Sequence, residues 1–307
     1  LEFSGTQIAM DGNLTVTDTL RGGTTKVTKG KNLVLSGGRL LGDRFHGELS
    51  AENVTFSNQK IQGVLYNKGG VSCIGNVTVG GLVSAGTLSM EDDGVLTVNG
   101  DLKLQTDGMM LGGKVIAKSD IYVEDQAKIG KLNLNGGAKQ TLSGNIATEE
   151  LSINCLGADM QGTVTVQKLL DYQAGTITGK EIYLADEAMI KNEHFIGSLS
   201  LLNWTPEKRG DITGNITVRN GGSIVGNAVI TGTLTAAGSA AIDGTISVGT
   251  LKSASSLTME DGSVLTVQGQ ASLGGVLTGG ELKVCEDLFV NGLTASSEVC
   301  VRGDVDV

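Results

Sequence analysis

The sequence is short of proline and of aromatic residues. It contains one Pro in 307 residues, and Phe, Trp and Tyr together make up 3% of the chain. A β-sandwich usually has longer strands with proline in its turns, so that fold is disfavoured. Collagen is excluded because proline is missing and glycine has no three-residue period. No run of about 18 apolar residues occurs, so the sequence predicts no membrane-spanning helix in this segment.

Histidine and basic residues are also scarce. His46 and His194 are the only two histidines, so catalytic arrangements that need an imidazole base are poorly supplied. The chain has 23 Lys and Arg against 33 Asp and Glu, a net charge of −10. Nucleic-acid binding needs basic patches that displace counterions, so we expect no nucleic-acid partner.

Cysteine is too rare for a disulfide framework. The four cysteines show neither a CxxC pair nor a metal-ligand spacing. They are interpreted as free thiols in small buried core positions. These residues are Cys73, Cys155, Cys285 and Cys300.

Glycine and small aliphatic residues are abundant instead. The chain has 47 Gly and 39% hydrophobic residues, which is too hydrophobic for a disordered chain. From Gly214 onward it divides into alternating runs of three to five residues, such as Asn-Ile-Thr-Val and Thr-Ile-Ser-Val, which are closed by Gly, Asn, Asp or Ser. Alternation of this kind predicts short strands, and Gly and Asn suit the sharp bends between them.

An internal repeat organises the chain. Residues 75–100 align without gaps to residues 244–269, and 15 of the 26 positions are identical. Gly-Asn steps before strands recur at Gly12, Gly75, Gly144 and Gly214. Their spacing fits three or four coils of about 17–22 residues, which is a solenoid period.

These patterns predict an all-β fold, a single-stranded parallel β-helix (β-solenoid) with about three short strands per coil. We expect one continuous solenoid over residues 1–307, with roughly 14–17 coils stacked about 4.8 Å apart. Residues 1–4, Leu-Glu-Phe-Ser, are interpreted as a possible cloning remnant at the start of a fragment of a longer protein. Residues 187–209 interrupt the pattern and predict a longer loop.

The segments 139–145 (Lys-Gln-Thr-Leu-Ser-Gly-Asn), 150–154 (Glu-Leu-Ser-Ile-Asn) and 59–63 (Gln-Lys-Ile-Gln-Gly) resemble repeats of bacterial surface β-helix proteins. The resemblance is to the filamentous-haemagglutinin-like class of adhesins and toxin-delivery stalks. The six-residue units of the C-terminal third also resemble bactofilins, cytoskeletal β-helices that polymerise end to end. The first resemblance implies an extracellular or cell-surface location, and the second a cytoplasmic one.

Residues with catalytic or metal-binding potential have simpler interpretations. The repeated Met-Glu-Asp at 90–92 and 259–261 could hold a divalent cation, but a solvated corner is favoured because the glycine-rich calcium nonapeptide is missing. Turn chemistry accounts for a set of Asp residues in or beside Asp-Gly turns. That set is Asp11, Asp93, Asp107, Asp243 and Asp261. We therefore expect no catalytic, cofactor-binding or metal-binding residues and no cofactor.

Other motifs fit ordinary solenoid structure. The Arg-Gly-Asp tripeptides at 209–211 and 302–304, a sequence associated with integrin attachment, are interpreted as two corners. Trp204 could stack on a sugar or cover the edge of the core. Thr-x-Thr pairs are reminiscent of ice-binding faces, but their spacing is irregular; they are Thr15/Thr17, Thr163/Thr165, Thr176/Thr178 and Thr233/Thr235. Asn-x-Thr sequons reflect a turn Asn before a strand Thr; they include Asn13, Asn53, Asn76, Asn203 and Asn215.

The sequence thus predicts a non-enzymatic structural and adhesive rod of a bacterial surface or secreted protein. It would present binding loops to an unknown receptor or glycan, or span to a target cell, with further coils of a longer solenoid as neighbours. A carbohydrate-active β-helix enzyme, a lyase or hydrolase, and a bactofilin-like polymer are the alternatives.

Overall fold

The computed structural model describes residues 1–23, 25–28, 33–106, 108–192 and 194–307. The described residues form β-strands and no helix, and their strand pairs run parallel. The predicted all-β parallel solenoid is therefore confirmed, with about 16 turns. The chain divides into two compact units, Leu1–Val164 (unit 1) and Thr165–Val307 (unit 2). A single continuous solenoid over residues 1–307 stays a prediction.

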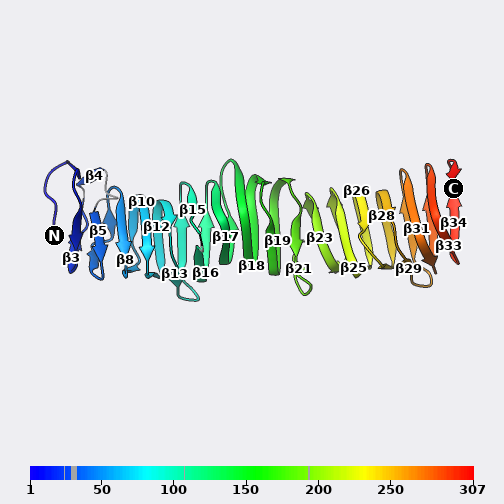
Figure 1. Ribbon diagram of the computed structural model, residues 1–307, viewed down its shortest axis with the longest axis horizontal. Coiled ribbons are helices and arrows are strands. Elements are labelled where there is room, and N and C mark those ends of the chain that lie inside the picture. Colours follow the sequence, from blue (N-terminus) through cyan, green and yellow to red (C-terminus); the bar gives the residue numbers. More distant parts are fainter. Residues whose placement is uncertain (24, 29–32, 107, 193) are drawn as a thin grey trace. The chain divides into compact units, whose positions relative to one another are not determined.

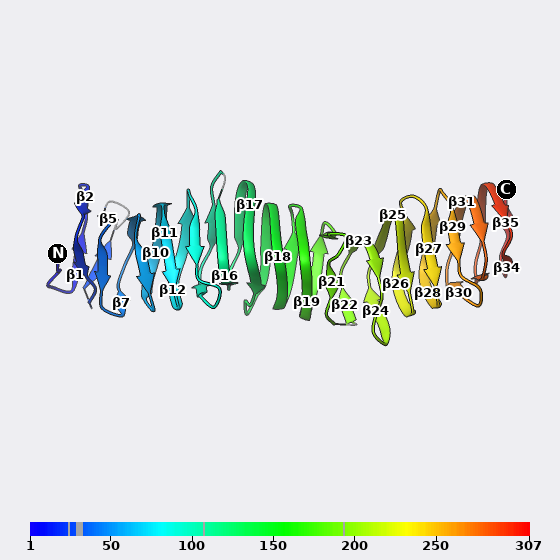
Figure 2. The same cartoon turned by 90° about the horizontal axis from the view of Figure 1, so that it is seen from below.

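Within each unit, successive strands lie side by side across the coils (Figures 1 and 2). The strands listed first are β1 (Gln7–Ala9), β2 (Leu14–Val16), β3 (Thr19–Arg21), β4 (Lys26–Thr28), β5 (Leu33–Ser36), β6 (Arg39–Leu41), β7 (Arg44–Phe45), β8 (Leu49–Glu52), β9 (Thr55–Ser57), β10 (Lys60–Gly69), β11 (Val71–Ile74), β12 (Asn76–Ser84), β13 (Leu88–Met90), β14 (Val95–Val98), β15 (Leu102–Leu104), β16 (Met109–Ala117), β17 (Ile121–Leu134) and β18 (Lys139–Met160).

The remaining strands begin at the last residue of unit 1. They are β19 (Val164–Gly179), β20 (Ile182–Leu184), β21 (Met189–Ile190), β22 (His194–Ile196), β23 (Leu199–Trp204), β24 (Arg209–Thr213), β25 (Ile216–Val225), β26 (Asn227–Ala236), β27 (Ala240–Asp243), β28 (Thr245–Ser253), β29 (Leu257–Met259), β30 (Val264–Val267), β31 (Ala271–Thr278), β32 (Glu281–Val284), β33 (Leu288–Ala295), β34 (Glu298–Val301) and β35 (Val305–Asp306).

Each coil contributes a short segment to three stacked parallel sheets, as unit 2 illustrates. Sheet A pairs residues 251–253 of β28 with residues 271–273 of β31. Sheet B pairs β29 with the end of β31, and sheet C pairs β30 with β32. Register partners lie between 16 residues apart, as for Arg44 and Lys60, and 21 apart, as for Ile121 and Leu142. The fold has three strands per coil because each sheet takes one.

The core is a column of aliphatic side chains that alternate inward along each strand. In β30, Leu265 and Val267 are fully buried, whereas Val264 and Thr266 are partly exposed. Leu265 lies in register between Ile246 and Leu282 of the adjacent coils, so its side chain meets apolar neighbours on both sides. The predicted inward orientation of Leu265 is confirmed.

The internal repeat is also a structural repeat, with one copy in each unit. Strands β12, β13 and β14 have the same lengths and spacing as β28, β29 and β30. Even a buried hydroxyl is repeated. Ser84 Oγ donates to the carbonyl of Gly86 at 2.8 Å, and Ser253 Oγ donates to the carbonyl of Ser255 at 3.1 Å. The identical residues of the two copies therefore encode one coil geometry twice.

Glycine forms a column at the corner that enters sheet A in unit 2. Its members are Gly197, Gly214, Gly232, Gly249 and Gly269. A Cβ on Gly214 would collide with the carbonyl oxygen of Gly197, and a Cβ on Gly232 would collide with that of Gly214. Gly214 also has a φ of 147°, a conformation that other residues rarely adopt. The coils approach too closely at this corner for any side chain.

Two sequence interpretations need correction. Residues 187–209, predicted as a longer loop, contain β21, β22 and β23. Phe195 is fully buried and Trp204 is 6% exposed, so the unusual residues of this segment fill the core. Of the four cysteines, Cys73 and Cys155 are buried, but Cys300 is exposed and Cys285 is half-buried.

Candidate binding groove

One row of outward side chains follows sheet A from coil to coil in unit 2. Strand register places one residue of each coil in this row, which we call the sheet-A row, and neighbours in it are about 4.8 Å apart. Its members are Tyr183, Ser200, Thr217, Thr235, Lys252, Ser272, Phe289 and Asp306. Hydroxyl groups occupy half of these positions. The row is therefore a linear array of hydrogen-bonding groups.

Three shallow hollows lie along this row, with volumes of about 430, 440 and 270 Å³. Thr235 and Lys252 line both the first and the second hollow. Ser272 and Asn291 line both the second and the third. Because neighbouring hollows share residues, they form one elongated depression, which we call the sheet-A groove.

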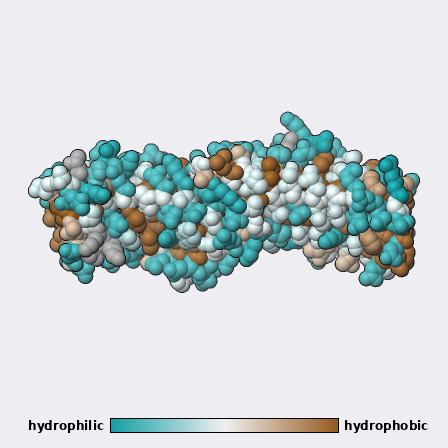
Figure 3. All heavy atoms as spheres, turned by 90° about the horizontal axis from the view of Figure 1, so that it is seen from above, coloured by the Kyte–Doolittle hydropathy of each residue, from teal (hydrophilic) through white to brown (hydrophobic). Residues whose placement is uncertain are grey.

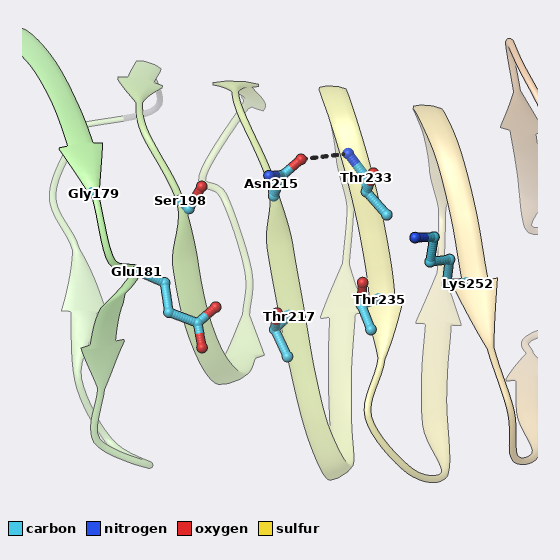
Figure 4. Close-up of a pocket in the computed structure, with 8 residues that line it drawn as sticks. All are labelled: Gly179, Glu181, Ser198, Asn215, Thr217, Thr233, Thr235 and Lys252. Carbon is cyan, nitrogen blue, oxygen red and sulfur yellow. Dashed lines mark hydrogen bonds between the residues drawn. The ribbon is translucent and has the colours of Figure 1, made fainter. Parts of the chain in front are cut away.

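The glycine column forms the low edge of the groove. Ser198, Asn215 and Thr233 line the first hollow, and each directly follows a glycine of the column. Asn215 Oδ1 accepts a hydrogen bond from the backbone N–H of Thr233 at 2.8 Å, which ties two coils together (Figure 4). In Figure 3 a broad area over unit 2 is pale, the colour of residues with intermediate hydropathy. The walls thus consist of small polar groups.

An arginine covers the N-terminal end of the row. The Arg219 guanidinium lies 4.0 Å from the ring centroid of Tyr183. It also donates to the carbonyl of Leu184 at 2.7 Å and to Asp186 Oδ1 at 2.8 Å. Ser200 is only 4% exposed although its side chain points outward. These contacts fix Arg219 in place and occupy its charge.

Lys252, in the middle of the groove, has an exposed ammonium with no hydrogen-bond or ion-pair partner among the described residues. Its neighbours in the row on either side, Thr235 and Ser272, are neutral. Figure 4 shows the ammonium pointing back toward the strand of Thr233 and Thr235. Glu181 lies at the opposite end of that view, four coils or about 19 Å away. The groove therefore has an uncompensated positive charge at its centre.

Unit 1 has a corresponding row: Thr15, Val34, Ser50, Tyr66, Val83, Lys103, Tyr122 and Ser143. Lys103 lies 5.5 Å above the ring centroid of Tyr122. The Tyr122 hydroxyl donates to Asp120 at 3.0 Å, and this hydrogen bond raises the pKa of the tyrosine. In the internal repeat Val83 occupies the position of Lys252. One coil geometry thus carries an apolar residue in one unit and a cation in the other.

The residues singled out as possible metal ligands do not come together. Glu91 and Asp92, and Glu260 and Asp261 in the second copy, are exposed at corners, as the sequence indicates. Asp11, Asp93 and Asp243 are also exposed, and Asp107 lies outside the described residues. In the described part of the chain, one group of three potential ligands lies within reach of a single ion, formed by Glu281, Glu298 and Cys300. The Lys283 ammonium lies 2.7 Å from Glu281 and neutralises it.

The two Arg-Gly-Asp tripeptides differ in structure. The first is not a corner, because Arg209 to Asp211 belong to strand β24. Arg209 pairs with Asp211 at 3.3 Å, and Gly210 packs against the Trp204 ring. Trp204 therefore covers the core edge, the second of its two interpretations. The other tripeptide, at 302–304, is an exposed turn between β34 and β35, as predicted.

Other flagged residues are scattered. His46 is half-buried and His194 is exposed on β22. Of the Thr-x-Thr pairs, Thr233/Thr235 lines the groove, as does the sequon residue Asn215. The sequence analysis missed Lys252 and the glycine column. The signal for the column was present as glycines 17 to 20 residues apart, two residues before an inward aliphatic position.

No helix among the described residues is long and apolar enough to cross a membrane. No protein-family model, curated protein or solved structure matches the chain. The groove and the fold are therefore the basis for a functional assignment.

Proposed function

We propose that this chain is a structural and adhesive element of a bacterial surface or secreted protein, in which a β-solenoid displays a non-catalytic binding face. The main support is the sheet-A groove, where one side chain per coil repeats along a row. Such a surface suits an extended ligand that contacts several coils. The proposal replaces variable outer loops, the binding elements expected from the sequence, with a sheet face.

The charges in the groove support binding rather than bond cleavage. Glu181 and Asp306 are the carboxylates that line its hollows. The coil of Glu181 and the coil of Asp306 are seven steps apart, or about 34 Å. Glycoside hydrolases that use two carboxyl groups hold them about 5–9.5 Å apart. The two carboxylates are thus too far apart to act on one glycosidic bond.

The stacked coils also suit a load-bearing role. Each coil pairs its backbone with the coils on either side, so that the hydrogen-bond ladders run along the stack within each unit. Stability in such repeats comes from many nearest-neighbour contacts. A face carried on this framework keeps its side chains at fixed intervals.

Adhesion of coated beads tests the proposal. Beads carrying the purified chain should attach to some members of a panel of immobilised polysaccharides and extracellular-matrix proteins, and should leave them intact. Attachment to none of them would contradict the adhesive role. Cleavage of a polysaccharide would favour the enzyme alternative, and filaments of the purified protein in electron micrographs would favour the bactofilin-like one.

A further inference from the structure

We propose that the sheet-A groove of unit 2 binds an anionic polysaccharide, with Lys252 as its charge-recognition residue. This inference rests on the proposed adhesive function and specifies the ligand class. The chain carries a net charge of −10, which repels polyanions, so a local cation is needed to hold one. Lys252 is such a cation, because it has no partner among the described residues and lines two adjoining hollows.

The groups around Lys252 match a sugar chain. Thr235 and Ser272 place hydroxyls one coil before and one coil after it, and Asn291 adds an amide in the adjoining hollow. Phe289, two coils or about 10 Å away, is 40% exposed in the third hollow. Hydroxyls and amides pair with sugar hydroxyls, an aromatic face stacks on a sugar ring, and an ammonium pairs with a carboxylate or sulfate.

An acidic peptide fits this surface less well. Extended peptides usually bind by adding a strand to an open sheet edge, where backbone groups are free. In sheet A the backbone of β28 pairs with β26 on one side and β31 on the other. Only side chains are left to hold a ligand on this face, and that favours a chain rich in hydroxyl groups over a peptide.

The internal repeat supplies a substitution with a built-in structural precedent. Val83 occupies the Lys252 position in a coil of the same geometry, so Lys252→Val should fold. Lys252→Arg retains the charge. The matched control is Lys283→Val, which removes the same charge from sheet C, where Lys283 pairs with Glu281.

The experiment measures binding of oligogalacturonate, its neutral methyl ester, sulfated dextran and polyglutamate to the full chain by calorimetry. We expect binding of an anionic glycan, carboxylated or sulfated, that weakens with salt, no binding of the ester, and weaker binding of polyglutamate. Lys252→Val should reduce affinity about tenfold or more, whereas Lys252→Arg and Lys283→Val should leave it within about twofold.

Three results would overturn the assignment: binding of neither anionic glycan, unchanged affinity in Lys252→Val, or equal affinity for polyglutamate. Circular dichroism of each variant verifies the fold, and Phe289→Ala provides a second probe, since loss of the ring should weaken binding of the glycan and not of polyglutamate. The proposed function has its own readout, because beads that adhere to neutral or protein surfaces would retain the adhesive role while this ligand class fails.

Discussion

Replacing Leu265 by aspartate should unfold the coil around it. The leucine is fully buried between Ile246 and Leu282. Loss of its burial costs about 1.5–3 kcal/mol, and an unpartnered polar group in its place costs about 1–3 kcal/mol more. The expected loss of about 3–5 kcal/mol is a large part of a typical folding free energy of 5–15 kcal/mol.

The control is Thr266→Asp, one residue further along the same strand. Thr266 is partly exposed and lies in register between Ser247 and Lys283, so the new carboxylate faces solvent and a cation. Its cost should be about 0.5 kcal/mol or less. Thermal unfolding followed by circular dichroism compares the two variants. A Thr266→Asp variant that is the less stable of the two would refute the strand register and the core assignment.

The pH dependence gives an independent check. Burial raises the pKa of the carboxyl introduced by Leu265→Asp above its ordinary value of about 3.9. The unfolded state then holds fewer protons than the folded state between the two pKa values. The penalty is therefore full above the folded pKa and falls as the pH drops toward 4. A loss of stability that is the same at pH 4 and pH 7 would show that the carboxyl reaches solvent.

The damage should also stay local, because coils contact only their neighbours. Limited proteolysis of Leu265→Asp should cut within unit 2 first. Leu96, the repeat partner of Leu265, is fully buried between Val77 and Val115 in unit 1. Leu96→Asp should move the first cuts to unit 1. Identical cleavage patterns for the two variants would contradict a nearest-neighbour solenoid.

Three further outcomes are expected. Thiol titration should find four free thiols under denaturing, non-reducing conditions, with Cys300 reacting first in the native protein at pH 8 and Cys73 last, because burial raises the pKa of Cys73 to about 12; prompt native labelling of Cys73 would contradict its burial. Incubation with neutral and acidic polysaccharides should release no new reducing ends or unsaturated products, and turnover abolished by one Asp substitution would overturn the non-enzymatic role. Asp171→Ala should cost about 1–2 kcal/mol in urea unfolding, because Asp171 is 9% exposed and accepts from Lys191 at 3.1 Å, whereas Lys191→Ala should cost less because that side chain is 58% exposed; the reverse order would contradict this account.

Local patterns were enough to predict the fold class and the strand register. The alternation around Leu265 indicates which side faces the core, since a strand has a side-chain period of two. Position within a coil is harder to predict, because it depends on turn lengths that local patterns do not specify. Cys300 is exposed because it pairs with the outward Lys283, which leaves Val299 and Val301 on the inner side of β34.

The groove escaped prediction for the same reason. Lys252 lies 17 residues after Thr235 and 20 before Ser272, so no constant period brings the three together. Trp204 and Pro206 made residues 187–209 look irregular. Trp204 is nevertheless a core residue, and Pro206 lies in the turn between β23 and β24. Large side chains in a sequence of small ones are read as interruptions, although a solenoid interior accepts them.

The glycine column keeps sheet A in phase while coil length varies. Successive glycines are 17, 18, 17 and 20 residues apart, yet each stands two residues before an inward residue of the same ladder. In the longest of these intervals, residues 260–263 form the turn between sheets B and C. Additional residues can thus be inserted at that corner without shifting the start of sheet A. A solenoid built this way can change its length coil by coil and still display one groove residue at every step.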